Sequence, residues 1–403
     1  MKSILFKIQQ FPHLSETFVL NHIIMAIKLG YEVKILVKDV LDFEKSMHVD
    51  KLKRYHIAEK IIHENYHIPN NKFFRLIKAV KISFSISNWS KIISFFKLKS
   101  KFSLTWLYEI AFYNQFRKTD IIHVQYGTNV HPVDILKKAG LLKSKLIVSF
   151  HGHDAFFPIN GFIENNGYYQ HLFTGDNLVV ANTPYLAEKI KGLGCSKENL
   201  TTIPVPVDIE YFHPDKNLVN GKEIKIITVG RLDPVKGHYV AIEFINRIRK
   251  KGLSITFTIV GEGSEYEKLK RKIAELTLEK TINLVGRKSQ GEVRDLLNQS
   301  DIYLFTGIPV AEGRRETQGL ATLEAQACGL PVLAFDSGGV KYTMKNGITG
   351  FLCAENDLNC LSEKLQLLCN KNLRKKMGGE ARKFVQEVYS QNEVKKKWKA
   401  IYK

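Results

Sequence analysis

Short runs rich in β-branched residues alternate with longer helical patterns along both halves of this 403-residue chain. The alternation is typical of an α/β protein with parallel sheets, because a helix returns the chain between two parallel strands. A single hydrophobic core stops growing at roughly 250–300 residues, so a chain of this length is expected to fold as two domains. We therefore predict two doubly wound, Rossmann-like units with a cleft between them.

The pattern predicts strands of the first unit over 3–8, 32–37, 121–125, 146–150, 177–180 and 200–203, with helices over 18–29 and 184–193. It predicts strands of the second unit over 225–229, 254–260, 282–284, 302–305 and 331–334, with helices over 237–251, 265–276, 290–299 and 319–327. Ile203–Gly221 lacks sustained periodicity and is interrupted by prolines, so we place the linker there. The predicted domains are 1–208 and 209–388, followed by a C-terminal helix over 389–403 that returns to the first domain.

The segment Lys72–Lys101 carries eight Lys or Arg and no Asp or Glu, interleaved with large apolar side chains. A basic, aromatic-rich, amphipathic stretch has the composition of a segment that lies on an anionic bilayer surface. The alternative is a pair of helices packed on the first domain with a solvated basic face. The chain as a whole has a formal net charge of +20, which favours an anionic partner. No recognised nucleic-acid motif accompanies the charge, so we do not expect nucleic acid.

The N-terminal residues have no apolar core or cleavage site of a secretory signal, because their short apolar run is interrupted by Lys7. Apolar stretches elsewhere are shorter than the roughly 20 residues of a transmembrane helix. The cysteines are five in number, without a CxxC pair, which is typical of a reducing compartment. We expect a cytoplasmic protein, held peripherally on the inner face of the cell membrane.

The segment Glu316–Gly329, ETQGLATLEAQACG, contains two carboxylates with seven residues between them. Glu316 lies in a predicted loop, and Glu324 lies in the helix predicted to follow it. A carboxylate at Glu324 suits a bidentate hold on the two hydroxyls of a ribose. Taken alone, a glutamate pair at this spacing is most often a solvated helix face.

A second constellation lies upstream, in the sequence VGRLDPVKG. A predicted strand ends at Gly230, and Arg231 and Lys236 flank the turn that opens a helix at Gly237. Backbone N–H groups at a helix start, with two cations beside them, form a site for a diphosphate. Ligands of open α/β sheets bind at the carboxyl ends of strands, so the position of this turn favours a phosphate site over an ordinary surface turn.

Further motifs complete an ordered set. After VGRLDPVKG come IVGEG, LVG, SDIYL, the two-glutamate segment, GLPV and GG, at Ile259–Gly263, Leu284–Gly286, Ser300–Leu304, Glu316–Glu324, Gly329–Val332 and Gly338–Gly339. In the first half, FPHLSETF spans Phe11–Phe18 and HGHD spans His151–Asp154. The set resembles the family 4 retaining glycosyltransferases of the GT-B fold, in the subgroup that builds bacterial exopolysaccharide, capsule and lipopolysaccharide chains. The resemblance covers nearly the whole chain.

The resemblance implies a nucleotide-sugar donor site in the second domain, with a UDP-sugar favoured and a GDP-sugar possible. Arg231 and Lys236 would bind the donor diphosphate and stabilise its charge as the glycosidic bond breaks. Glu324 would hold the ribose, and Gly286 and Arg287 would contact the base through backbone atoms. The donor sugar would be positioned by Glu316 and by the backbone of Thr317, Gln318, Gly319 and Leu320.

The resemblance also implies that the first domain binds the acceptor, a lipid-linked glycan or an oligosaccharide. His151 would lie near the reacting carbon, on the first-domain side of the cleft, and Asp154 would support its loop. The acceptor loop would include Ser15, Glu16 and Thr17. The catalytic set implied is His151, Glu316, Arg231 and Lys236. The departing phosphate would accept the acceptor's proton on the same face of the sugar, so no strong enzymic base is required.

Two other functions remain open. A GT-B phosphorylase or hydrolase acting on a glycan could use Glu316 and Glu324 as acid and base, although Arg231 and Lys236 have no part in that mechanism. A non-catalytic scaffold on the membrane surface could keep the GT-B shell without the reaction. The presence of all four of these charged residues argues against the scaffold.

The chain departs from the family pattern in three places. Lys341 and Tyr342 replace a common Pro-Glu after the GG element, and Val205-Pro206 replaces a frequent Asn-Gly at the linker; we expect local structural effects. The insert Gly307–Arg315 adds Glu312 as an alternative first carboxylate, but spacing favours Glu316.

We predict no metal and no cofactor. His151, His153 and Asp154 lie together in sequence, but histidines separated by one residue in a loop more often have structural roles. The chain has no Asp-x-Asp motif. GEG at Gly261–Gly263 lacks the third glycine of a dinucleotide fingerprint and no P-loop motif occurs, which argues against nicotinamide and P-loop chemistry.

Overall fold

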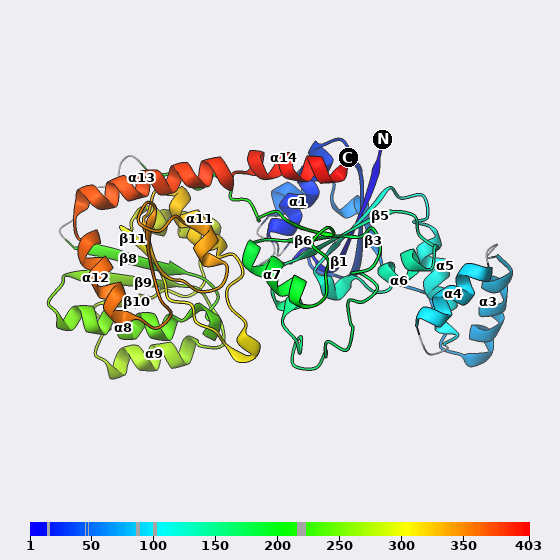
Figure 1. Ribbon diagram of the computed structural model, residues 1–403, viewed down its shortest axis with the longest axis horizontal. Helices are drawn as coiled ribbons and strands as arrows, with labels where there is room; N and C mark the ends of the chain where they lie inside the picture. The colour runs from blue at the N-terminus through cyan, green and yellow to red at the C-terminus, as the bar shows by residue number, and fades with distance from the viewer. Residues whose placement is uncertain (14–16, 45, 47, 86–88, 100–102, 216–222) are drawn as a thin grey trace. The chain divides into compact units, whose positions relative to one another are not determined.

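The computed structural model describes residues 1–13, 17–44, 46, 48–85, 89–99, 103–215 and 223–403 (Figure 1). The chain divides into two compact units. Unit 1 comprises Met1–Ala181, Ala187–Thr202 and Tyr402, and unit 2 comprises Asn182–Leu186, Ile203–Ile401 and Lys403. Each unit is built on one parallel sheet, as the alternation of strands and helices predicts.

Unit 1 has a seven-stranded sheet in the order β3-β2-β1-β4-β5-β6-β7, and all its strand pairs are parallel. The strands are β1 (Ser3–Phe11), β2 (Glu32–Val40), β3 (Ile61–His63), β4 (Ile121–Gln125), β5 (Lys145–Phe150), β6 (Leu178–Ala181) and β7 (Leu200–Thr202). The described helices are α1 (Thr17–Lys28), α2 (Val49–Arg54), α3 (Lys72–Ser85), α4 (Trp89–Leu98), α5 (Thr105–Asn114), α6 (Val133–Lys138) and α7 (Pro184–Gly192). Short 3₁₀ turns form η1 (Ala58–Lys60), η2 (Gly127–Asn129) and η3 (His153–Ala155).

Unit 2 has a six-stranded parallel sheet in the order β10-β9-β8-β11-β12-β13. The strands are β8 (Ile224–Val229), β9 (Ile255–Val260), β10 (Ile282–Leu284), β11 (Ile302–Phe305), β12 (Val332–Phe335) and β13 (Gly350–Cys353). The helices are α8 (His238–Lys250), α9 (Tyr266–Glu275), α10 (Gln290–Asn298), α11 (Leu320–Ala327), α12 (Leu358–Leu368), α13 (Lys371–Val388) and α14 (Gln391–Tyr402). Three 3₁₀ turns are η4 (Pro234–Lys236), η5 (Ala311–Gly313) and η6 (Val340–Thr343).

Alternate strand residues of unit 2 feed two separate cores, one on each face of the sheet. Ile226 packs in a cluster with α8, α9 and α12, while its neighbour Ile227 packs with α10, α11 and α13. This is the side-chain alternation of a strand that is buried on both faces. Figure 1 shows the helices on both sides of this sheet. The cores hold the carboxyl ends of the strands in fixed positions, and the loops that follow them begin there.

The predicted strands and helices are confirmed, most within one to three residues of their expected ends. The strands over Ile121–Gln125, Ile282–Leu284 and Ile302–Phe305 have the predicted bounds. The prediction missed β3 and β13, which are three and four residues long. Within the described part of the basic segment Lys72–Lys101, the chain forms α3 and α4.

The cysteine count did not predict the disulfide that joins Cys353 and Cys360. Cys353 ends β13 and Cys360 lies in the first turn of α12, so the short connection brings two cysteines seven residues apart within bonding distance. The other cysteines, Cys195, Cys328 and Cys369, are free. Among the described residues, no helix combines the length and the apolar character that crossing a membrane requires.

Two adjacent glycines of α13 provide a matched test of how α13 packs on the chain that follows α11. A Cβ on Gly378 would overlap the backbone carbonyl of Gly329, whereas a Cβ on Gly379 would meet no atom within 4 Å. We predict that Gly378→Ala lowers the free energy of unfolding by about 1–3 kcal/mol, because backbone must move to admit the methyl group. Gly379→Ala should instead raise it by about 0.5–1 kcal/mol, through helix propensity alone. Thermal unfolding of both variants checks the pair, and equal shifts would contradict the close approach.

Candidate functional site

The loops after β8 and β11 lie at the point where the strand order of unit 2 reverses. β8 and β11 are hydrogen-bonded neighbours, and the chain leaves β8 toward β9 on one side and β11 toward β12 on the other. Such a switch point leaves a crevice at the carboxyl ends of the two strands, where ligands of open α/β sheets bind. The first loop contains Arg231 and Lys236, and the second contains Glu316.

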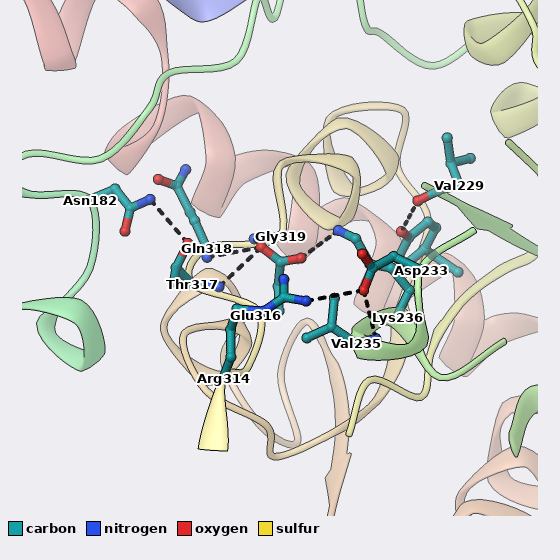
Figure 2. A network of polar contacts seen from close by, with 11 residues as sticks. Asn182, Val229, Asp233, Val235, Lys236, Arg314, Glu316, Thr317, Gln318 and Gly319 are labelled. Atoms are coloured by element: carbon teal, nitrogen blue, oxygen red, sulfur yellow. Dashed lines mark hydrogen bonds and ion pairs between the residues drawn. The ribbon is translucent and has the colours of Figure 1, made fainter. Parts of the chain in front are cut away.

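Lys236 and Glu316 form an ion pair at this edge of the sheet. The ammonium of Lys236, the last residue of η4, donates a short hydrogen bond to Oε2 of Glu316. The other carboxylate oxygen, Oε1, accepts hydrogen bonds from the backbone N–H groups of Thr317 (3.1 Å), Gln318 (3.3 Å) and Gly319 (3.1 Å). Figure 2 shows the carboxylate between the lysine on one side and these N–H groups on the other.

The three N–H groups form an anion site at the start of α11. Gly319 is the N-cap residue of α11 and has a left-handed backbone, with φ 79°. Successive N–H groups that converge at a helix N-terminus attract an anion through their partial positive charges. Burial tends to raise the pKa of Glu316, but the charge of Lys236 and the hydrogen bonds outweigh it and hold the pKa at about 2. Glu316 is therefore an ionised carboxylate that fills this anion site.

Glu324 differs from Glu316 in its surroundings. It lies in α11, eight residues after Glu316, and is half-buried. Burial raises the pKa of Glu324 to about 8, so this carboxyl is largely protonated at pH 7. The two glutamates of the segment are thus held in opposite protonation states by the same loop and helix. A carboxyl with this pKa can lose its proton near neutral pH when a ligand donates hydrogen bonds to it.

Two arginines bring further positive charge to the turn after β8. The Arg231 side chain is exposed, and within the described residues it forms no ion pair. Asp233 caps η4 by accepting a hydrogen bond from the N–H of Val235 at 3.0 Å, and Arg314 reaches the same carboxylate at 3.5 Å. Figure 2 shows Arg314 approaching from the loop after β11. Arg231 is free to meet an anion that enters the crevice.

Gly286 and Arg287 follow β10 on the same edge of the sheet. The carbonyl of Gly286, which has φ 70°, accepts a hydrogen bond from the N–H of Gly261 at 2.9 Å. Arg287 pairs with Glu262 at 3.0 Å through exposed side chains. Gly286 and Arg287 therefore both contact the GEG element. Their contact with a nucleotide base stays a prediction.

The backbone around Glu316 is held from several sides by residues that the sequence analysis did not assign to the site. The side-chain amide of Gln318 makes two hydrogen bonds to the backbone of Val205, at 2.9 and 2.8 Å. The hydroxyl of Thr183 donates to the carbonyl of Thr317 at 2.6 Å. The N–H of Gly339 donates to the carbonyl of Glu316 at 2.8 Å, and a Cβ on Gly338 would overlap that carbonyl. The GG element is therefore the backbone support of Glu316.

In unit 1, the HGHD element forms a tight loop after β5. The buried carboxylate of Asp154 accepts hydrogen bonds from the N–H groups of His151 (3.1 Å), Gly152 (2.8 Å) and Gly127 (2.9 Å). Asp154 thus fastens two strand-end loops together. His151 is half-buried, lies against the rings of Phe18 and Tyr126, and has a pKa lowered by burial to about 4. Its imidazole is neutral at pH 7.

His151 continues into a buried chain of polar side chains that the sequence analysis did not find. Its Nε2 lies 2.9 Å from Oε1 of Gln125, and the amide nitrogen of Gln125 lies 3.3 Å from Nε2 of His123. The other nitrogen of His123 lies 2.7 Å from the hydroxyl of Tyr402, which is 2.9 Å from Nε2 of His22. This series of contacts therefore runs from the loop of His151 to Tyr402 in α14 and restricts the orientation of the imidazole.

The remaining predicted residues are placed as follows. Thr17 is the first residue of α1 and is half-buried. Ser15 and Glu16 lie outside the described residues, as does the side chain of Glu312. Leu320 is the first residue of α11. Within the described part of the chain, no three His, Cys, Asp or Glu side chains form a metal-ligand cluster. Both oxygens of Asp154 are engaged by backbone N–H groups.

Both halves of the chain match families of known proteins. A family described as Glycosyltransferase Family 4 matches residues 15–211, and a family described as Glycosyl transferases group 1 matches residues 210–384. The amylovoran biosynthesis glycosyltransferase AmsK of Erwinia amylovora is 29% identical over 363 residues, which cover 88% of this chain and 87% of AmsK. An uncharacterised glycosyltransferase of Haemophilus influenzae is 30% identical over 249 residues, which cover 58% of this chain and 67% of that protein.

Solved structures agree with the fold. The HepE protein of Anabaena, crystallised with UDP and glucose, superposes with a TM-score of 0.73 at 16% identity, over 100% of this chain and 99% of HepE. The TarM protein superposes with a TM-score of 0.72 at 16% identity, again over 100% and 99% of the two chains. Family models match both halves, relatives span nearly the full length, and the solved structures share the two-sheet architecture. The chain therefore belongs to the family 4 glycosyltransferases and has the GT-B fold.

Proposed function

We propose that this glycosyltransferase transfers a sugar from a nucleoside-diphosphate sugar to a lipid-linked glycan, with retention at the anomeric carbon, in the synthesis of a cell-surface polysaccharide. The observation that carries the donor assignment is the anion site of unit 2, where Lys236 and three backbone N–H groups surround Glu316. A diphosphate is the anion that such a site at a strand switch point would accept.

In the proposed donor complex, the diphosphate takes over part of the role that Glu316 has in the free protein. Lys236 would turn to the phosphate oxygens, and Arg231, which is exposed beside it, would bind from the other side. Glu316 would then accept hydrogen bonds from the donor sugar, while the N–H groups of Thr317–Gly319 remain in place. Because negative charge on the diphosphate grows as the glycosidic bond breaks, both cations would stabilise the transition state more than the ground state.

The transfer itself is proposed to need no strong base. The bond between the anomeric carbon and the diphosphate oxygen breaks, and the acceptor oxygen bonds to the same face of the sugar. The released phosphate oxygen takes the proton of the acceptor hydroxyl. His151, neutral and held by Gln125, would orient a sugar hydroxyl or the acceptor rather than act as a cationic acid. We also propose that no metal is required, because Arg231 and Lys236 supply the positive charge at the diphosphate.

The relatives support the choice of substrates. AmsK is named for amylovoran biosynthesis, and WcaL of Salmonella typhimurium, 27% identical over 89% of each chain, is named as a putative colanic acid biosynthesis glycosyltransferase. HepE and TarM were crystallised with UDP. We therefore propose a UDP-sugar as the donor, with a GDP-sugar as the alternative. A lipid-linked acceptor would bring the enzyme to the cytoplasmic face of the membrane as a peripheral protein.

The hydrolase alternative has one observation in its favour. The pKa of Glu324 is about 8 and that of Glu316 is about 2, a separation that an acid and base pair of a glycosidase also needs. However, both oxygens of Glu316 accept hydrogen bonds, one from Lys236 and one from backbone N–H groups, which makes this carboxylate a weak base. The transferase accounts for Lys236 and Arg231, and the hydrolase does not.

The first prediction concerns the cations of the donor site. Calorimetric titration should show that Arg231→Ala weakens UDP binding by about 10–100-fold, because a charge-assisted hydrogen bond to phosphate contributes about 1.5–3 kcal/mol. Arg231 is the cleaner substitution, since Lys236→Ala would also leave the Glu316 carboxylate without its partner. Lys375→Ala, which removes an exposed cation from α13, is the control. If Arg231→Ala and Lys375→Ala bind UDP as tightly as the unmodified protein, the diphosphate is bound elsewhere.

The second prediction concerns the pH dependence contributed by Glu324. With a pKa of about 8, this carboxyl must lose its proton before it accepts hydrogen bonds from ribose hydroxyls. The affinity for UDP-glucose should therefore rise with pH, by up to about tenfold per unit below pH 8, and level off above it. Glu316 and His238, with pKa values of about 2 and 4, titrate below this range. Glu324→Gln should bind more weakly at high pH and lose the dependence; a pH-independent affinity of the unmodified protein would argue against Glu324 as the ribose ligand.

A further inference from the structure

The apolar face of α3 points to solvent. Phe73, Leu76, Ile77, Val80 and Phe84 follow the spacing i, i+3, i+4, i+7 and i+11, which places them on one face of the helix. Their exposed fractions are 66%, 54%, 39%, 45% and 86%. A helix on the surface of a globular protein normally turns such a face to the core. Here the face has no partner among the described residues that buries it.

The opposite face of α3 is already fastened to unit 1. Ala79 is buried, and the hydroxyl of Tyr108 in α5 donates to the carbonyl of Arg75 at 2.6 Å. Arg75 in turn donates through Nε to the carbonyl of Pro69 at 3.0 Å. Rotation of α3 to bury its apolar face would break these contacts. The exposed face is therefore a fixed feature of the helix.

The next helix, α4, also exposes apolar side chains. It buries Ile92 and Phe95, and Lys99, the residue after its last turn, pairs with Glu109 of α5 at 2.8 Å. On its outer side, Trp89 and Ile93 are 51% and 50% exposed. Figure 1 shows α3 and α4 side by side with α5, at the right-hand end of the picture.

The charges that border this apolar surface have one sign. Exposed lysines flank it on both helices, and none of them pairs with an acidic side chain of the described residues: Lys72, Lys81 and Lys97. No Asp or Glu occurs anywhere between residues 72 and 101. An apolar face rimmed by cations complements an interface that offers both hydrocarbon and negative charge. An anionic lipid bilayer has both at its surface.

We propose that the outer face of α3 and α4, defined by Phe73, Leu76, Ile77, Val80, Phe84, Trp89 and Ile93 and their flanking lysines, docks on an anionic membrane surface. The aromatic and aliphatic side chains enter the boundary between headgroups and acyl chains, and the lysines contact the lipid phosphates. This inference gives a molecular basis to the peripheral location in the proposed function, but the docking does not depend on the transferase reaction.

Vesicle sedimentation tests the proposal with three variants of the full chain. The first replaces apolar residues of the face, Phe73→Ser, Leu76→Ser and Phe84→Ser. The second reverses charges, Lys72→Glu, Lys81→Glu and Lys97→Glu. The control replaces two exposed apolar residues of unit 2, Ile348→Ser and Leu367→Ser, which are 50% and 47% exposed. The probes are vesicles that contain phosphatidylglycerol and vesicles of phosphatidylcholine alone.

The unmodified protein and the control should bind the anionic vesicles, and binding should weaken when NaCl rises from about 0.05 M to about 0.5 M. Charge reversal should lower the affinity by at least about fivefold per lysine, and the serine variant by more than about tenfold. Equal binding to both kinds of vesicle, or binding that survives in both face variants, would overturn the proposal. Light scattering that shows a dimer of the unmodified protein and a monomer of the serine variant alone would also overturn the proposal, because the face would then be an interface between two copies.

The same variants separate this proposal from the donor assignment. All three should keep the UDP affinity of the unmodified protein, since they lie in unit 1 or far in sequence from the donor loops. Arg231→Ala should in turn sediment with anionic vesicles as the unmodified protein does. An unmodified protein that sediments with anionic vesicles but does not bind UDP would count against the proposed function, and one that binds UDP but does not sediment would count against the docking face.

Discussion

The proposed donor site of unit 2 depends on one interaction, the contact of the Glu316 carboxylate with Lys236 and with the N–H groups at the start of α11. These groups lie on a helix N-terminus and on the turn after a neighbouring strand, and they would be costly to leave unpaired in a crevice. Glu316 satisfies them in the free protein. We propose that this carboxylate holds Lys236 and the α11 loop in position until a diphosphate enters.

This arrangement explains several features of the chain that are otherwise unconnected. Glu316 must be held in a loop that turns sharply into α11, and the GG element, Gln318 and Thr183 hold its backbone from three sides. The same loop leads into α11, which contains Glu324. The same physical logic recurs in unit 1, where Asp154 gathers three backbone N–H groups and so fixes the loop of His151. In each unit, a carboxylate that accepts hydrogen bonds from backbone N–H groups organises a strand-end loop.

Much of this could be predicted from the sequence, because the relevant signals are local. Strands and helices follow from hydrophobic period, and Arg231, Lys236 and the two glutamates follow from motifs at strand ends. The pairing of Lys236 with Glu316 joins residues 80 positions apart and depends on the sheet order, which no local pattern contains. The contact of His123 with Tyr402 spans 279 positions and likewise could not be predicted from a local sequence pattern. The exposed side of α3 was open to two interpretations, since an amphipathic pattern does not say which face the domain covers.

A crystal structure of the protein with UDP would test the central claim most directly. We expect phosphate oxygens within hydrogen-bonding distance of Lys236 and Arg231, and ribose hydroxyls bonded to the carboxylate of Glu324. Glu316 should be released from Lys236 but still bonded to the N–H groups of the α11 loop. A nucleotide bound away from these residues, or a Lys236–Glu316 pair left intact beside a bound diphosphate, would contradict the claim that Glu316 reserves the donor's anion site.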